Sequence, residues 1–188
     1  GVFVPYKNQN EQALVHIATR LSSCLQLSGD FMSVQSKAYL EYQNKRFRLL
    51  NPISSLTPYS TTLIPCFSKK ILLIKPYPGL DYSHFRLDQV DGIIHDLYHS
   101  GTACETLDWG EDYSLSAFIE KCNRHNIGFY MAPAIKTAEV YDSTRALQKQ
   151  GAKMIWGMSL ESAYVKLLLG YGNFNEDSID QFLDADIA

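Results

Sequence analysis

Runs of apolar residues in the second half of the chain predict buried strands that alternate with helices. Four runs have the length and apolar character of strands buried on both faces: Ile71–Lys75, Gly92–His95, Gly128–Ala132 and Lys153–Trp156. Apolar positions three and four residues apart predict helices over Leu115–Cys122, Tyr141–Gln150, Leu160–Gly170 and Glu176–Leu183. This order is typical of an α/β fold, a small parallel Rossmann-like or flavodoxin-like sheet of about four strands with helices on both faces.

The preceding residues form a weaker pattern, which we interpret as a partial α/β segment over residues 1–48. Val2–Tyr6 predicts a short buried strand, and Ala38–Tyr42 predicts a second strand followed by a turn at Asn44–Lys45. Between them, Glu11–Leu21 places its apolar residues on one face of a predicted helix. Residues 49–66 mix prolines with serines and threonines, which predicts a linker before an α/β domain over 67–188.

Composition excludes several classes of partner. The chain has 17 Lys and Arg against 20 Asp and Glu, a net charge of −3, so no basic excess is available to bind nucleic acid. No run approaches the roughly 20 apolar residues that span a bilayer, so we expect no membrane partner. Its 4 cysteines lack C-x-x-C spacing, which indicates a reducing compartment and a cytoplasmic location.

Two loops that follow predicted strands carry candidate chemistry. His95, Asp96, His99 and Cys104 crowd one loop, but a structural zinc needs four ligands and no second cluster supplies the remainder. We therefore interpret this segment as a polar loop and expect no metal and no cofactor.

Other polar and aromatic side chains near strand ends each allow two interpretations. Glu139 and Asp142 lie near a helix start, where carboxylates either cap the helix or bind a ligand ammonium. Tyr98 and Trp109 either line a pocket or pack over a sheet edge.

Three stretches in order along the chain carry a family resemblance. Ile71–Gly79 is a strand followed by a Tyr/Pro-Gly turn, and Asp91–Ala103 is a strand followed by a loop similar to Y-G-x-G-N. Tyr141–Leu169 places Ala-Leu, Met-Ser and Lys-Leu pairs at family positions. From about Lys69 to Ala188 the chain resembles the C-terminal domain of the bacterial L-asparaginase/glutaminase family, especially the cytoplasmic type. Residues 1–65 resemble the end of that family's N-terminal domain and its linker.

The resemblance implies an amidohydrolase of two α/β domains that forms homo-oligomers. Such enzymes use an N-terminal-domain threonine nucleophile, a Thr-Asp-Lys relay and residues from a neighbouring subunit. By the same resemblance, Tyr98, Gly101 and Thr102 belong to a substrate-binding loop whose amides face an amino-acid carboxylate, and Glu139 faces the ammonium.

Departures from the family pattern concern the catalytic groups. The sequence contains no T-G-G-T-I and no H-G-T-D segment, and Arg48–Ser54, where the family's lysine is expected, contains no lysine. Thr102 stands where the loop's asparagine is expected, and Gly157 replaces the aspartate before Met158. Amide hydrolysis needs an activated nucleophile, a proton relay and oxyanion donors together.

We therefore predict no catalytic residue in this chain, and expect it to bind a small amino acid or amide or to act as a regulatory or assembly module. Two alternatives stay open. The chain is part of an active L-asparaginase whose missing segment carries the nucleophile, or it is a protein-interaction module without a ligand.

Overall fold

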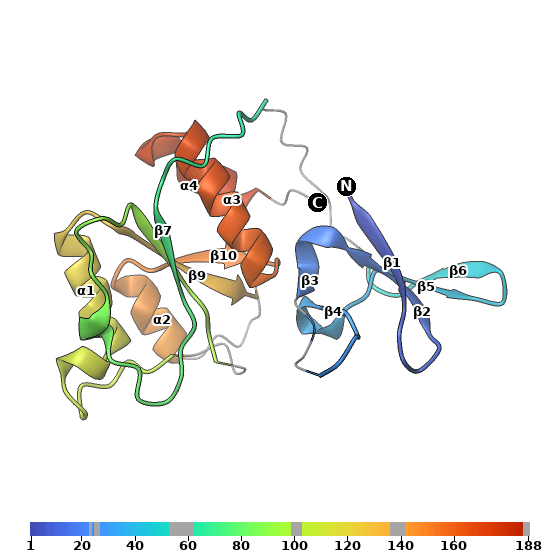
Figure 1. Cartoon of the computed structure of the whole chain (residues 1–188), viewed down its shortest axis with the longest axis horizontal. Helices are drawn as coiled ribbons and strands as arrows, with labels where there is room; N and C mark the ends of the chain where they lie inside the picture. Colours follow the sequence, from blue (N-terminus) through green and yellow to red (C-terminus); the bar gives the residue numbers. More distant parts are fainter. Residues whose placement is uncertain (23, 25–26, 53–61, 99–102, 136–141, 186–188) are drawn as a thin grey trace.

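The computed structural model describes residues 1–22, 24, 27–52, 62–98, 103–135 and 142–185. Within these residues the strands form a four-stranded parallel sheet, a four-stranded antiparallel sheet and a two-stranded ribbon (Figure 1).

The parallel sheet confirms all four strands predicted for the second half. Its members are β7 (Ile71–Ile74), β8 (Gly92–His95), β9 (Gly128–Ala134) and β10 (Lys153–Trp156), in the spatial order β10-β9-β8-β7. Every neighbouring pair is parallel, so all four carboxyl ends lie at one edge of the sheet.

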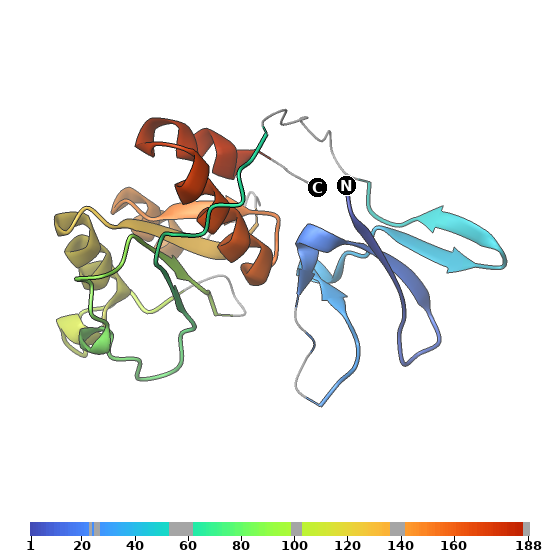
Figure 2. The same ribbon diagram turned by 45° about the horizontal axis from the view of Figure 1, so that its top comes forward.

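Helices cover both faces of this sheet, as predicted (Figures 1 and 2). One face carries α1 (Leu115–Arg124) and α2 (Asp142–Lys149), and the other carries α3 (Leu160–Asn173) and α4 (Glu176–Asp184). Ser114 and Ser159 cap α1 and α3 by accepting hydrogen bonds from backbone N–H groups of the first turn. Among the described helices, none has the length and apolar character needed to cross a membrane.

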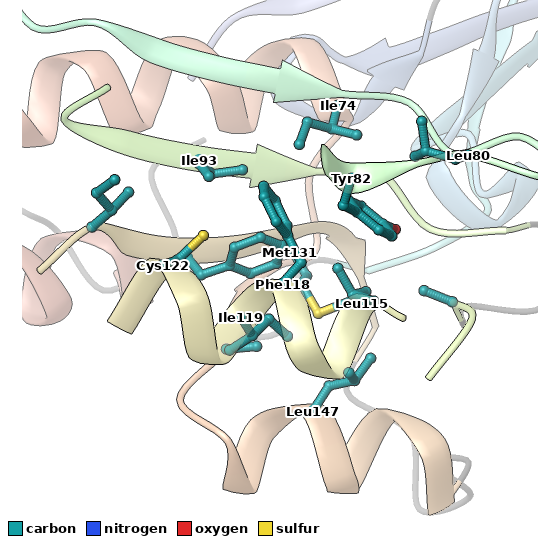
Figure 3. Packing of buried hydrophobic residues seen from close by; sticks show 14 of the residues in the cluster. Ile74, Leu80, Tyr82, Ile93, Leu115, Phe118, Ile119, Cys122, Met131 and Leu147 are labelled. Atoms are coloured by element: carbon teal, nitrogen blue, oxygen red, sulfur yellow. The ribbon is translucent and has the colours of Figure 1, made fainter. Parts of the chain in front are cut away.

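Two apolar cores result from the alternation of side chains along the strands. On the α1 side, Ile93 and Met131 pack against Phe118 and Ile119, all of them buried (Figure 3). Ile94, the neighbour of Ile93, points to the opposite core beneath α3 and α4. The central strands β8 and β9 are therefore buried on both faces and the edge strands β7 and β10 partly so, which explains their continuous apolar runs.

The first 49 residues build a different, antiparallel sheet. Its strands are β1 (Phe3–Lys7), β2 (Ala13–Ile17), β5 (Leu40–Gln43) and β6 (Arg46–Leu49), in that spatial order. Two short strands, β3 (Leu21–Ser22) and β4 (Met32–Ser33), pair beside it.

Two expectations for this segment are wrong. Glu11–Leu21 is not an α-helix: β2 occupies its centre and pairs with β1 on one side and β5 on the other, and only Ala18–Arg20 forms a 3-10 turn. The hydrogen bonds of this ladder override a helical spacing that was only a weak local preference. The strand near Val2–Tyr6 exists but is not buried, because only one face of it is partly covered. No α-helix occurs among the described residues of this segment, so its partial α/β character is not observed.

The turn at Asn44–Lys45 is confirmed. Both residues have positive φ, 52° and 59°, as the tight turns between antiparallel strands require. They join β5 to β6 in a hairpin that projects away from the rest of the chain (Figure 2).

Backbone and side-chain hydrogen bonds connect the segments that flank the parallel sheet. The amide of Ser159 donates to the carbonyl of Thr19 at 2.9 Å, which joins the start of α3 to the N-terminal segment. The side chain of Asn173 bonds the amide and the carbonyl of Ile64, at 2.7 and 2.9 Å. The described end of the predicted linker is therefore attached to the end of α3.

Candidate functional site

A cavity of about 540 Å³ opens beyond the carboxyl ends of β7 and β8. Ligands of parallel α/β sheets usually bind at this edge. Aromatic side chains dominate its wall, and no described lining residue carries a charge. The described lining residues are Tyr77, Pro78, Gly79, Leu80, Tyr82, Tyr98, Cys104, Trp109 and Tyr113.

The first part of the wall is the turn that follows β7. Gly79 has a φ of 83°, a conformation that glycine adopts without steric cost, and the chain reverses there. The Asp81 carboxylate then accepts a 2.8 Å bond from the Ser83 amide and starts a 3-10 turn over Tyr82–His84. Hydrogen bonds from Ser83 lower the pKa of Asp81, so the carboxylate stays ionised in this capping role.

Tyr82 and His95 form a buried pair beneath the cavity. The Tyr82 ring stacks on Phe118 with centroids 4.7 Å apart, and its hydroxyl lies 2.9 Å from Nε2 of His95. Nδ1 of His95 bonds the carbonyl oxygen of Asp96, which can only accept, so Nδ1 carries the proton. Nε2 is then the acceptor and the Tyr82 hydroxyl donates to it.

Burial keeps both groups of this pair neutral. It lowers the pKa of His95 to about 4, although the bond to the Asp96 carbonyl acts in the opposite direction. It also raises the pKa of Tyr82, and the nearby Tyr98 and Cys104 add to this effect. The pair therefore fixes the position of the Tyr82 ring and is not a charged catalytic dyad at neutral pH.

The remaining wall comes from the segment between β8 and α1. Tyr98 follows β8 and is half-buried, and burial raises the pKa of its hydroxyl. Cys104 lies beside it, and the Cys104 carbonyl accepts a 2.8 Å bond from the amide of Leu115, which attaches the loop to α1. Trp109 and Tyr113 close the wall from the residues that lead into the helix.

Of the four residues assigned to substrate binding from the sequence, the structure places one. Tyr98 lines the cavity, whereas Gly101, Thr102 and Glu139 lie outside the described residues. His99 lies outside them as well.

The candidate metal ligands do not form a cluster in the described part of the chain, where no group of three His, Cys, Asp or Glu side chains comes together. Both ring nitrogens of His95 are occupied by Tyr82 and Asp96. Asp96 itself accepts from the Leu97 amide at 2.8 Å, and burial raises the pKa of its carboxyl group.

Sequence reasoning missed three aromatic residues of the wall, Tyr77, Tyr82 and Tyr113. The signal for Tyr77 was the Tyr/Pro-Gly turn after β7, which was noted only as a family feature. Tyr82 and Tyr113 reach the cavity from two 3-10 turns, Tyr82–His84 and Glu111–Tyr113, and no periodicity marks either position. For Trp109 the pocket interpretation is supported, because its side chain lines the cavity and 76% of the residue is exposed.

Two departures from the family pattern have local structural roles here. Arg48, at the expected lysine segment, lies on the exposed strand β6, where its Nη2 and Nε bond the carboxylate of Glu41. Gly157 has a φ of 68° and donates to the Ala134 carbonyl at 2.8 Å, so glycine suits the turn between β10 and α3.

Comparison with known proteins bears on the fold. No protein-family model matches the sequence, and no curated protein matches it either. Among solved structures, the chain is similar to the thermostable L-asparaginase from Thermococcus kodakarensis, with a TM-score of 0.67 and 17% identity. It is also similar to L-asparaginase I from Vibrio cholerae O1 biovar eltor, with a TM-score of 0.61 and 17% identity.

The fold is asparaginase-like. Each match covers 93% of this chain and 54% of the asparaginase chain, so the chain spans about half the length of these enzymes. The expected resemblance to L-asparaginases is thereby confirmed for the fold, while activity and ligand are separate questions.

Proposed function

We propose that this chain is an asparaginase-like binding module that takes a small amino acid or amide and does not hydrolyse it. One observation carries the proposal: the asparaginase-like sheet has a cavity at the carboxyl ends of β7 and β8, and Tyr98 of the predicted binding loop lines it. The volume of the cavity, about 540 Å³, lies within the range of about 300–1,000 Å³ found for small-molecule sites.

In this proposal the amino-acid head group binds to the loop that follows β8. Backbone amides of the Tyr98–Ala103 loop take the carboxylate, with Gly101 and Thr102 within that loop, and Glu139 takes the ammonium. The domain division over 1–48, 49–66 and 67–188, a homo-oligomeric assembly and a cytoplasmic location belong to the same proposal.

We expect no hydrolysis by this chain because its sequence lacks the T-G-G-T-I and H-G-T-D segments. Without an assembled nucleophile and base, amide cleavage slows by several powers of ten. A second candidate function is that of an active L-asparaginase in which a further segment supplies the nucleophile. This second function is favoured because the matches cover only 54% of each solved asparaginase chain, so nearly half of those enzymes has no counterpart in this chain.

A thermal-shift panel of the twenty amino acids and their amides tests binding. A ligand present at 100 times its dissociation constant should stabilise the fold by about 2.7 kcal/mol, which raises Tm by roughly 5–10 °C. Tyr98→Ala should remove the shift, because the side chain forms part of the wall. Tyr42→Ala, which alters a tyrosine 44% exposed on β5, should leave the shift unchanged.

Two results count against the proposal. If no member of the panel raises Tm at millimolar concentration, the chain does not bind this class of ligand. If Tyr98→Ala and Glu139→Ala both keep the full shift, the ligand binds somewhere else.

A further inference from the structure

The residues in the wall of the cavity indicate which kind of amino-acid side chain it can bind. Three aromatic residues of the wall are exposed to solvent: Trp109 at 76%, Tyr77 at 55% and Tyr113 at 39%. Large aromatic side chains that gather around one opening in this way are typical of a binding surface and not of a packed core.

The inner part of the wall is already fixed in place. Tyr82 is 4% exposed, its ring stacks on Phe118 at 4.7 Å, and its hydroxyl bonds His95 at 2.9 Å. Phe118 belongs to α1 and is itself buried in the core (Figure 3). A ring that enters the cavity therefore meets a surface that needs no reordering, which favours binding.

The chemistry of the wall disfavours a polar ligand side chain. No described lining residue is charged, and the polar side-chain groups there are phenol hydroxyls, the indole N–H of Trp109 and the thiol of Cys104. A carboxamide side chain exchanges its bonds to water for bonds to these few groups, so its burial gains little free energy. An aromatic ring gains burial and also the edge-to-face or offset-stacked contacts that aromatic pairs prefer.

We propose that the cavity binds an amino acid with an aromatic side chain, its ring lying among Tyr77, Tyr98 and Trp109. This inference rests on the proposed function, since it takes from it the amino-acid head group and adds the identity of the side chain. Trp109 is the specificity-determining residue of this site, because it offers the largest exposed ring of the wall.

Isothermal titration of the purified chain with four free amino acids tests the inference. L-Phenylalanine, L-tryptophan, L-cyclohexylalanine and L-asparagine share one head group, so their affinities differ only through the side chain. The two aromatic amino acids should bind at least tenfold more tightly than asparagine. Phenylalanine should bind several-fold more tightly than cyclohexylalanine, which has a similar shape but no aromatic ring.

Two variants locate the site. Trp109→Ala should weaken phenylalanine binding at least tenfold, and Tyr77→Ala should weaken it too, while both proteins keep the wild-type Tm because these side chains are exposed. Phe47→Ala, which removes another exposed aromatic side chain on β6, should leave the affinity unchanged.

The outcomes separate this inference from the proposed function. Asparagine binding as tightly as phenylalanine overturns the aromatic preference and leaves the binding module intact. Equal affinities for phenylalanine and cyclohexylalanine overturn it in the same way. If phenylalanine binds to both Trp109→Ala and Tyr77→Ala as tightly as to wild type, its ring does not bind in this cavity, and the inference is overturned. If no amino acid or amide binds at all, the proposed function itself fails.

Discussion

Replacing Phe182 with alanine is expected to lower the free energy of unfolding by about 3–5 kcal/mol. The Phe182 side chain is fully buried between α3 and α4, stacks on Phe174 with centroids 4.8 Å apart and lies under the Lys166 ammonium at 5.5 Å. Its removal leaves a cavity that the surrounding helices fill only in part. Urea unfolding followed by circular dichroism measures the loss.

Phe47→Ala is the matched control for this substitution. Phe47 is 65% exposed on β6, and a surface change there should stay within about 0.5 kcal/mol of wild type. If Phe182→Ala were as mild as Phe47→Ala, α4 would not be packed on the sheet domain as described.

The second large effect is a dependence of stability on pH that originates from His95. Burial holds its pKa at about 4 in the folded chain, against about 6.5 in an unfolded one. Between these values the unfolded chain binds more protons, so acid destabilises the fold. The contribution is fully present above about pH 6.5 and is lost as the pH falls through about 4. It amounts to about 2–3 kcal/mol between pH 7.5 and 4.5.

His95→Gln should reduce the difference in unfolding free energy between pH 7.5 and pH 4.5 by about that amount, because glutamine does not titrate. Other acid-sensitive groups, including the buried His16, whose pKa is also lowered by burial, act equally in both proteins and cancel. His125→Gln, at an exposed position after α1, should behave as wild type. An unaltered pH dependence in His95→Gln would show that this imidazole does not stay neutral inside the fold.

The parallel sheet could be predicted from sequence because an apolar core covers each of its faces. Side chains of Ile71–Ile74 contact the cores on both faces, so this run is continuously apolar and differs clearly from the helical spacing of Leu115, Phe118 and Ile119. Strand and helix periodicities are then unambiguous.

The antiparallel sheet could be predicted only in part, because it is half-exposed. Every residue of β6 (Arg46–Leu49) is exposed, so its sequence shows no apolar run. In β2 the spacing of Leu14 and Ile17 matches that of a helix. The segment forms a strand because it pairs with β1 and β5. Pairing between distant segments leaves little trace in local sequence.

The fold class predicts the edge of the sheet at which the cavity lies. It does not predict most of the residues that form the wall of the cavity. Tyr98 and Trp109 could be suspected because they follow β8. Tyr82 could not, because its position depends on a stack with Phe118, 36 residues further on, and on a bond to His95 at the end of β8. Separate loops come together here only when the chain folds, so the local sequence around each of them does not reveal the contact.

We propose that this chain binds an amino acid or amide without hydrolysing it, and a single NMR sample tests both binding and hydrolysis. Saturation transfer from the protein to the tightest-binding amide of the panel reports contact, while the ammonium signal of the same tube reports hydrolysis. We expect clear saturation transfer, abolished by Tyr98→Ala, and no ammonium beyond a protein-free blank. Ammonium that accumulates in proportion to the protein would contradict this proposal, and so would the absence of saturation transfer for every amino acid and every amide of the panel.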